Sequence, residues 1–156
     1  MKKLLIIGDT DVASIAKKVA YATGDFAEIR VISLDDIREN IIEQLESYVC
    51  EFKYAFSAVE EFDQRVKLSQ MLEETSFRIA ILVSPKALIS PSAQIMNGTV
   101  IDEDARIGNN AVVAQFCCVC RGATIDDNCF VGDCCFIGED IAVKESSFLT
   151  AGTVLN

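Results

Sequence analysis

A chain of 156 residues with 51% hydrophobic residues and only two prolines is long enough for one folded domain or two small ones. Its net charge of -10 argues against binding to nucleic acid or to an anionic membrane surface, because both need basic patches. Histidine is absent, which excludes histidine-ligated metal sites and histidine-based catalysis.

The first residues, MKKLLIIGD, predict a buried strand rather than a signal peptide or a membrane span. Their apolar run covers only Leu4 to Ile7, which is much shorter than either segment requires. We therefore expect a cytoplasmic protein with no membrane-bound part. Thiols stay reduced in that compartment, so a disulfide framework is not expected among the seven cysteines.

Strands and helices alternate along the first half of the chain. Short apolar runs predict strands, and the segments between them carry apolar residues at helical spacing. The predicted strands are 3–8, 28–36, 53–59 and 78–83, and the predicted helices are 11–24, 37–48 and 60–76. This order predicts a small Rossmann-like α/β domain with a parallel sheet in residues 1–83.

From Val83 onward the sequence repeats every six residues. Thirteen consecutive positions at this spacing, ending at Leu155, are aliphatic, and eleven of the twelve residues four positions later are small. Such a hexapeptide repeat is typical of a parallel β-helix, and the left-handed triangular form with about 18 residues per coil fits it best. We expect about four coils in residues 84–156, with turns at Gly108, Gly132 and Gly138.

Six of the cysteines are concentrated in FCCVCRG and GDCCFIG. The repeat places three at small inward positions, where cysteine packs as a small apolar residue: Cys117, Cys129 and Cys135. The other three fall on outward or corner positions: Cys118, Cys120 and Cys134. We favour thiol packing over a reactive surface thiol, and either of these over a metal site or a disulfide.

Two segments, SPKALISPSAQI (84–95) and CRGATIDDNCFVG (120–132), resemble bacterial sugar acyltransferases that O-acetylate sialic acid or N-acetylate UDP-linked amino sugars. The resemblance covers nearly the full chain and includes the order of the two domains. It implies acetyl-CoA as the acyl donor and a nucleotide-sugar or a sugar as the acceptor. It also implies a homotrimer assembled through the β-helix and a role in surface glycan biosynthesis.

The resemblance assigns residues to the acceptor site. They are Gly8, Asp9 and Thr10 after the first strand, Asp35 and Asp36 after the second, and Arg65 after the third. In the family, a glycine-rich loop after the first strand lets the backbone approach a phosphate closely. The alternative for the acidic pair is a solvated strand end.

The segment IDEDARIGN (101–109) matches the family segment that carries the catalytic histidine. The resemblance places Glu103 at the histidine position, with Asp104 beside it. A carboxylate there can act as the general base for the acceptor. The family's acetyl-CoA contacts correspond to Gly138, Ala151 and Gly152.

Three functions remain open. The first is an acetyl-CoA-dependent sugar acetyltransferase with Glu103 as the base. The second is a catalytically silent structural or regulatory trimer, which the absence of histidine favours. The third is a sensor that binds a small molecule in residues 1–83.

Overall fold

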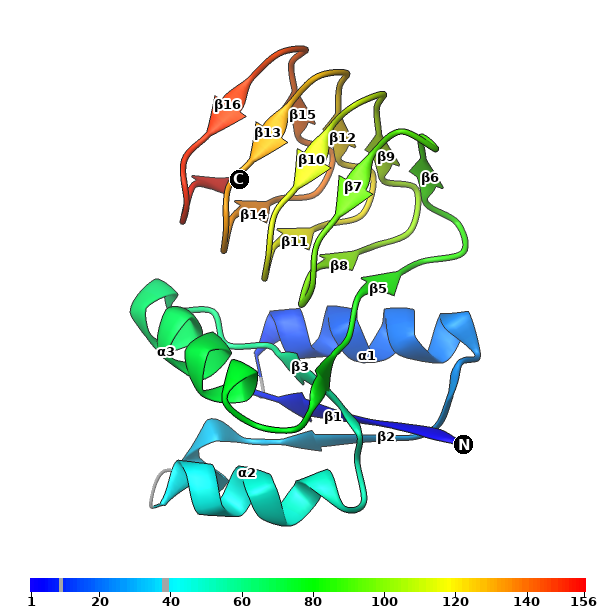
Figure 1. Ribbon diagram of the computed structural model, residues 1–156. Coiled ribbons are helices and arrows are strands. Elements are labelled where there is room, and N and C mark those ends of the chain that lie inside the picture. Colours follow the sequence, from blue (N-terminus) through cyan, green and yellow to red (C-terminus); the bar gives the residue numbers. More distant parts are fainter. Residues whose placement is uncertain (9, 38–39) are drawn as a thin grey trace. The chain divides into compact units, whose positions relative to one another are not determined.

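Figure 1 shows the computed structural model, which describes residues 1–8, 10–37 and 40–156, with the side chains of residues 36 and 37 excepted. The chain divides into two compact units, Met1–Ala80 and Ile81–Asn156. The first unit is an α/β sheet, and the second is a β-helix.

The first unit contains a four-stranded sheet in the order β2-β1-β3-β4, with every pair parallel. Its elements are β1 (Lys2–Ile7), α1 (Asp11–Thr23), β2 (Phe26–Ile32), the 3-10 helix η1 (Leu34–Ile37), α2 (Ile41–Val49), β3 (Tyr54–Ser57), α3 (Phe62–Glu73) and β4 (Arg78–Ile79). The order of strands and helices agrees with the prediction. The predicted strand 78–83 is interrupted, because Ala80 bonds back to Ala55 (2.9 Å) whereas Leu82 bonds to Thr99 of the β-helix (3.0 Å).

Helices cover both faces of this sheet. On one face, strand residues pack against α2 and α3 in a single apolar cluster that includes Leu5, Ile7, Leu45, Ala55, Leu68 and Leu72. α1 lies on the opposite face (Figure 1), and its buried residues recur at helical spacing: Val12, Ala13, Ala16, Val19 and Ala20. Burial of strand residues on both faces explains why β1 is a continuous apolar run in the sequence.

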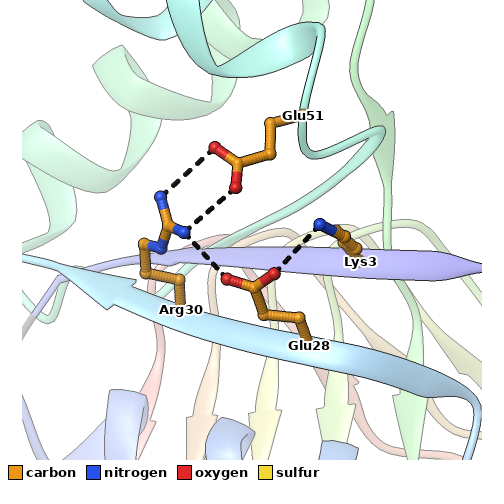
Figure 2. A network of polar contacts seen from close by, with 4 residues as sticks. All are labelled: Lys3, Glu28, Arg30 and Glu51. Atoms are coloured by element: carbon orange, nitrogen blue, oxygen red, sulfur yellow. Dashed lines mark hydrogen bonds and ion pairs between the residues drawn. The ribbon is translucent and has the colours of Figure 1, made fainter.

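An ion-pair network joins β1, β2 and the segment that follows α2 (Figure 2). The carboxylate of Glu28 lies 3.1 Å from Nζ of Lys3 and 2.8 Å from Nη2 of Arg30. Arg30 also reaches Glu51 at 3.1 Å, and its guanidinium carbon lies 4.6 Å from the centre of the buried Phe52 ring. The hydrogen bond from Lys3, followed by that from Arg30, lowers the pKa of Glu28.

We expect Glu28→Gln to lower the melting temperature by a few degrees at neutral pH and by less in acid. A carboxylate whose pKa is lower in the folded state stabilises the fold above its unfolded pKa, near 4.5, and loses this effect as the pH falls through the folded value. Melting curves from pH 7 down to about pH 3 check this. Glu46→Gln, at an exposed position of α2, is the control. An equal deficit at both pH values would contradict the prediction.

The second unit is a parallel β-helix built from thirteen two-residue strands. They are β5 (Leu82–Val83), β6 (Leu88–Ile89), β7 (Gln94–Ile95), β8 (Val100–Ile101), β9 (Arg106–Ile107), β10 (Val112–Val113), β11 (Cys118–Val119), β12 (Thr124–Ile125), β13 (Phe130–Val131), β14 (Phe136–Ile137), β15 (Ala142–Val143), β16 (Phe148–Leu149) and β17 (Val154–Leu155). Every third strand belongs to the same sheet, so Val119 pairs with Ile101 and Ile137, each 18 residues away. The predicted left-handed β-helix is confirmed (Figure 1).

Three sheets form the walls of the prism, and we name its edges after them. The first edge follows the strands of the β5 sheet, the second follows those of the β6 sheet, and the third follows those of the β7 sheet. Residues 18 apart therefore lie on the same edge, about 4.8 Å apart along the axis.

The interior of the β-helix alternates large and small side chains. One cluster contains the aliphatic residues of the repeat together with small ones such as Ala105, Ala111 and Ala123. Cys117, Cys129 and Cys135 belong to this cluster, and their predicted role in packing is confirmed.

The other three clustered cysteines differ from the prediction. All seven cysteines are free thiols, but Cys118, Cys120 and Cys134 are buried rather than exposed at the surface. Residues two apart on an extended segment point to the same side, and the sulfurs of Cys118 and Cys120 accordingly lie 3.9 Å apart. A reactive surface thiol in this region is therefore ruled out.

The corners of the β-helix follow the same six-residue period. Every sixth residue from 98 to 152 has a positive φ, and seven of these ten residues are not glycine. The predicted turn glycines are not among them. A Cβ on Gly132 would lie 2.8 Å from the amide nitrogen of Ala151, so this glycine is required for close approach of successive coils rather than for a special backbone conformation.

Candidate functional site

Glu103 and Asp104 lie on the first edge, between β8 and β9. The Glu103 side chain is 32% exposed, and its Oε2 lies 3.8 Å from Nζ of Lys86. Its amide donates to Oδ1 of the buried Asp102 at 2.7 Å, which fixes the corner. Asp104 is exposed, has a φ of 61° and donates its amide to the carbonyl of Lys86. Glu103 is therefore the more enclosed of the two predicted carboxylates.

A similar ion pair occurs two coils later on the same edge. Glu139 lies 36 residues after Glu103, and its Oε2 is 3.8 Å from Nη2 of Arg121. The Glu139 side chain is 65% exposed, twice the fraction of Glu103. The two corners thus present the same charge pair with different enclosure, and Glu139 is a matched control for Glu103.

A groove of about 490 Å³ runs along the second edge across three coils. Its lining comes from β6, β9, β12 and the corners that follow them, and includes Ser90, Arg106, Gly108, Asp126 and Asp127. Arg106 is its exposed cation. The sequence analysis missed this groove, although small residues at 90 and 108, which follow the aliphatic positions at an 18-residue interval, indicated it.

The predicted acetyl-CoA contacts lie on two different edges. Gly138 follows β14 and shares the first edge with Glu103, two coils away. Ala151 and Gly152 follow β16 on the third edge, where Gly152 has a φ of 76°. The three residues therefore do not form one contact surface within a single β-helix.

Gly8 and Thr10 lie at the carboxyl ends of β1 and β3. The sheet order changes direction between these strands, and ligands of open parallel sheets bind at such a point. Thr10 caps α1 by accepting from the amide of Ala13 at 3.4 Å, and its hydroxyl donates to the carbonyl of Ala58 at 2.6 Å. Asp9 lies outside the described residues.

The remaining predicted acceptor residues are dispersed. Asp35 is exposed in η1, where its amide donates to Oγ of Ser33 at 3.2 Å, and the Asp36 side chain lies outside the described part. Arg65 is 2% exposed in α3, and its Nε and Nη2 have no hydrogen-bond partner among the described residues. Ser57 at the end of β3 has an unpartnered buried hydroxyl as well. Arg65 and Ser57 are thus polar groups that a ligand could satisfy.

A smaller groove of about 190 Å³ lies between α1 and β2. Thr10, Ala13, Ser14, Lys17 and Val31 line it. The sequence analysis did not identify Ser14 and Lys17, although their spacing of four and seven residues from Thr10 puts them on one helix face. The groove offers two hydroxyls and one ammonium group to a polar ligand.

Two further properties bear on function. In the described part of the chain, no three histidine, cysteine, aspartate or glutamate side chains are placed to hold a metal ion. The described helices are too short or too polar to span a lipid bilayer.

The fold and its edges define a class of structure: a small parallel α/β unit followed by a left-handed β-helix of hexapeptide repeats. No family model matches the chain, and no curated protein is significantly similar to it in sequence. Solved structures are similar across both units.

One similar structure is the acetyltransferase domain of PglB from Neisseria gonorrhoeae in complex with acetyl coenzyme A, with a TM-score of 0.80 and 20% identity over 98% of this chain and 87% of that one. Another is a histidine-to-alanine mutant of GDP-perosamine N-acetyltransferase from Caulobacter crescentus with CoA and GDP-perosamine, with a TM-score of 0.75 and 17% identity over 100% and 89%. WeeI from Acinetobacter baumannii has a TM-score of 0.55 and 15% identity over 100% and 92%. The shared fold is thus that of the solved sugar acetyltransferases.

Proposed function

We propose that this protein is an acetyltransferase that uses acetyl-CoA to acetylate a sugar, either free or linked to a nucleotide. The observation that carries this proposal is the similarity of the whole chain, in both units, to acetyltransferases solved with acetyl-CoA or CoA. The groove on the second edge and the carboxylate corner on the first edge support it, because an elongated donor and a base are both needed.

The reaction follows from the chemistry of a thioester. An amine or hydroxyl of the sugar attacks the acetyl carbonyl carbon, so a new C–N or C–O bond forms and the C–S bond breaks. We assign Glu103 as the base that accepts the proton of the acceptor, which then passes to the leaving sulfur. Asp104 provides a second negative charge at this corner. Thr10, Asp35 and Arg65 are the proposed acceptor contacts.

We further propose a homotrimer with its interface on the β-helix. Phe130 and Phe148 stack at a centroid distance of 5.0 Å with planes 12° apart, yet they are 38% and 70% exposed. Such an exposed aromatic pair is typical of a protein interface. A trimer brings edges of neighbouring subunits together, so Gly138 of one subunit and Ala151 and Gly152 of the next can contact one acetyl-CoA.

Phe148→Asp is expected to reduce the mass in solution from three times 17.1 kDa to 17.1 kDa, because a charge replaces the most exposed ring of the stack. Sedimentation equilibrium measures this mass. Val154→Asp, at an equally accessible apolar position of the β5 sheet, is the control and retains the trimer. A wild-type monomer would overturn the trimer proposal.

The cysteine content supports a cytoplasmic location. All seven thiols are free, and thiols persist in a reducing compartment. Labelling of intact cells with a membrane-impermeant thiol reagent should leave the exposed Cys50 unmodified.

The function is tested by titrating the purified protein with acetyl-CoA in a calorimeter and by measuring CoA thiol release with a panel of amino sugars and sugar nucleotides. We expect saturable acetyl-CoA binding and release that depends on one acceptor. Saturable binding with no release from any acceptor would favour the catalytically silent alternative. No binding at about 1 mM acetyl-CoA would exclude the proposal.

A further inference from the structure

The amino end of α1 is where a parallel α/β sheet usually binds a diphosphate. Unpaired amides in the first turn of a helix attract anions, and the change of direction between β1 and β3 brings this turn to the carboxyl edge of the sheet. In this protein the position is already filled by the chain itself.

Two side chains satisfy the amides of the first turn. The amide of Asp11 donates to Oε1 of Glu60 at 3.2 Å, and the amide of Ala13 donates to the hydroxyl of Thr10 at 3.4 Å. Glu60 comes from the connection between β3 and α3, 49 residues away. Its carboxylate offers the same charge and the same acceptor oxygens as a phosphate would, so it takes the place of the ligand.

The backbone closes the remaining space. Gly8 has a φ of 126°, and a Cβ built on it would lie 2.6 Å from the carbonyl oxygen of Ala58. The Thr10 hydroxyl holds the same carbonyl at 2.6 Å. The close approach that a glycine permits is therefore used by the β3–α3 connection rather than left open for a phosphate.

Charge acts in the same direction. Asp11, in the first turn of α1, places a second exposed carboxylate beside Glu60. The adjoining groove of about 190 Å³, with Thr10, Ser14 and Lys17, is smaller than the pockets of about 300–1,000 Å³ that enclose a drug-sized ligand. Its size and its hydroxyl and ammonium groups fit a single sugar ring better than a sugar nucleotide.

We infer that Glu60 is a specificity-determining residue that excludes a diphosphate from the α1 terminus, so that the acceptor is an unphosphorylated amino sugar or sugar. The word acceptor rests on the proposed acetyltransferase function. The exclusion of diphosphate rests only on the contacts of Glu60, Thr10 and Gly8.

The experiment compares binding of UDP, GDP and inorganic pyrophosphate to the full-length wild type, Glu60→Ala and Glu61→Ala. Glu61 is the neighbouring carboxylate at the start of α3 and makes no side-chain capping bond, so its variant removes the same charge without freeing the Asp11 amide. We expect no saturable binding to the wild type or Glu61→Ala at about 5 mM, and at least about tenfold tighter binding to Glu60→Ala. NMR shifts of the Asp11 and Ala13 amides locate the bound anion.

Two results would overturn the inference. One is wild-type binding of a nucleoside diphosphate below about 1 mM, and the other is equal affinity of the wild type and Glu60→Ala. Melting curves of the three proteins establish that each is folded. Acetyl-CoA titration of the same samples tests the proposed function separately, because its loss would leave the comparison of diphosphate affinities intact.

Discussion

Glu103→Gln is expected to lower kcat for acetyl transfer by about 10²- to 10⁴-fold, the range over which a positioned base contributes to a rate. Glutamine keeps the size of the side chain but cannot take up a proton at neutral pH. The KM for acetyl-CoA should stay nearly constant, since the change acts on proton transfer and not on donor binding. Steady-state kinetics with a saturating acceptor measure both quantities.

The matched control is Glu139→Gln. It removes the same charge from the same edge, and it breaks a pair with Arg121 whose length equals that of the pair between Glu103 and Lys86. We expect Glu139→Gln to retain kcat within about twofold. If Glu103→Gln keeps most of the wild-type kcat, Glu103 is only a partner for Lys86, and the base must be sought elsewhere.

Val143→Asp should lower the free energy of unfolding by at least about 4 kcal/mol, because it buries an unpaired charge among apolar neighbours. Val143 is 3% exposed and belongs to the interior cluster of the β-helix. Each coil is stabilised by its neighbours, so the loss should spread to the coils on both sides. Urea unfolding at fixed protein concentration measures the effect.

Ala142→Asp is the control for this variant. Ala142 precedes Val143 in β15 but is exposed, since successive residues of a strand point to opposite faces. Its unfolding free energy should stay within about 0.5 kcal/mol of the wild type. Equal destabilisation by both variants would contradict the inward and outward assignment on which the fold is built.

The fold could be predicted because its period is short and unbroken. A six-residue repeat fixes which side chains point inward, and the 18-residue pairing of Val119 with Ile101 and Ile137 follows from three such repeats per coil. The corner conformations were harder to predict, because Asp104 and Phe116 adopt positive φ although only glycine is expected there by default. The repeat, rather than the residue type, imposes that conformation.

The candidate site could be predicted only in part. The resemblance identified the corner at Glu103, but spacing along one chain did not reveal that Gly138 and Gly152 lie on different edges. Enclosure of Glu103 and the contact of Glu60 with Asp11 depend on residues distant in the sequence. Such contacts follow from how the chain packs, and no local pattern encodes them.

The 18-residue pairing also constrains how this protein can change during evolution. A deletion or insertion of any other length would shift every later strand out of register and turn its interior residues outward. Whole coils, in contrast, can be added or removed while each later side chain keeps its edge and its orientation. The distance along the axis between the carboxylate corner and other groups of the β-helix can therefore be adjusted in steps of about 4.8 Å without redesigning either of them.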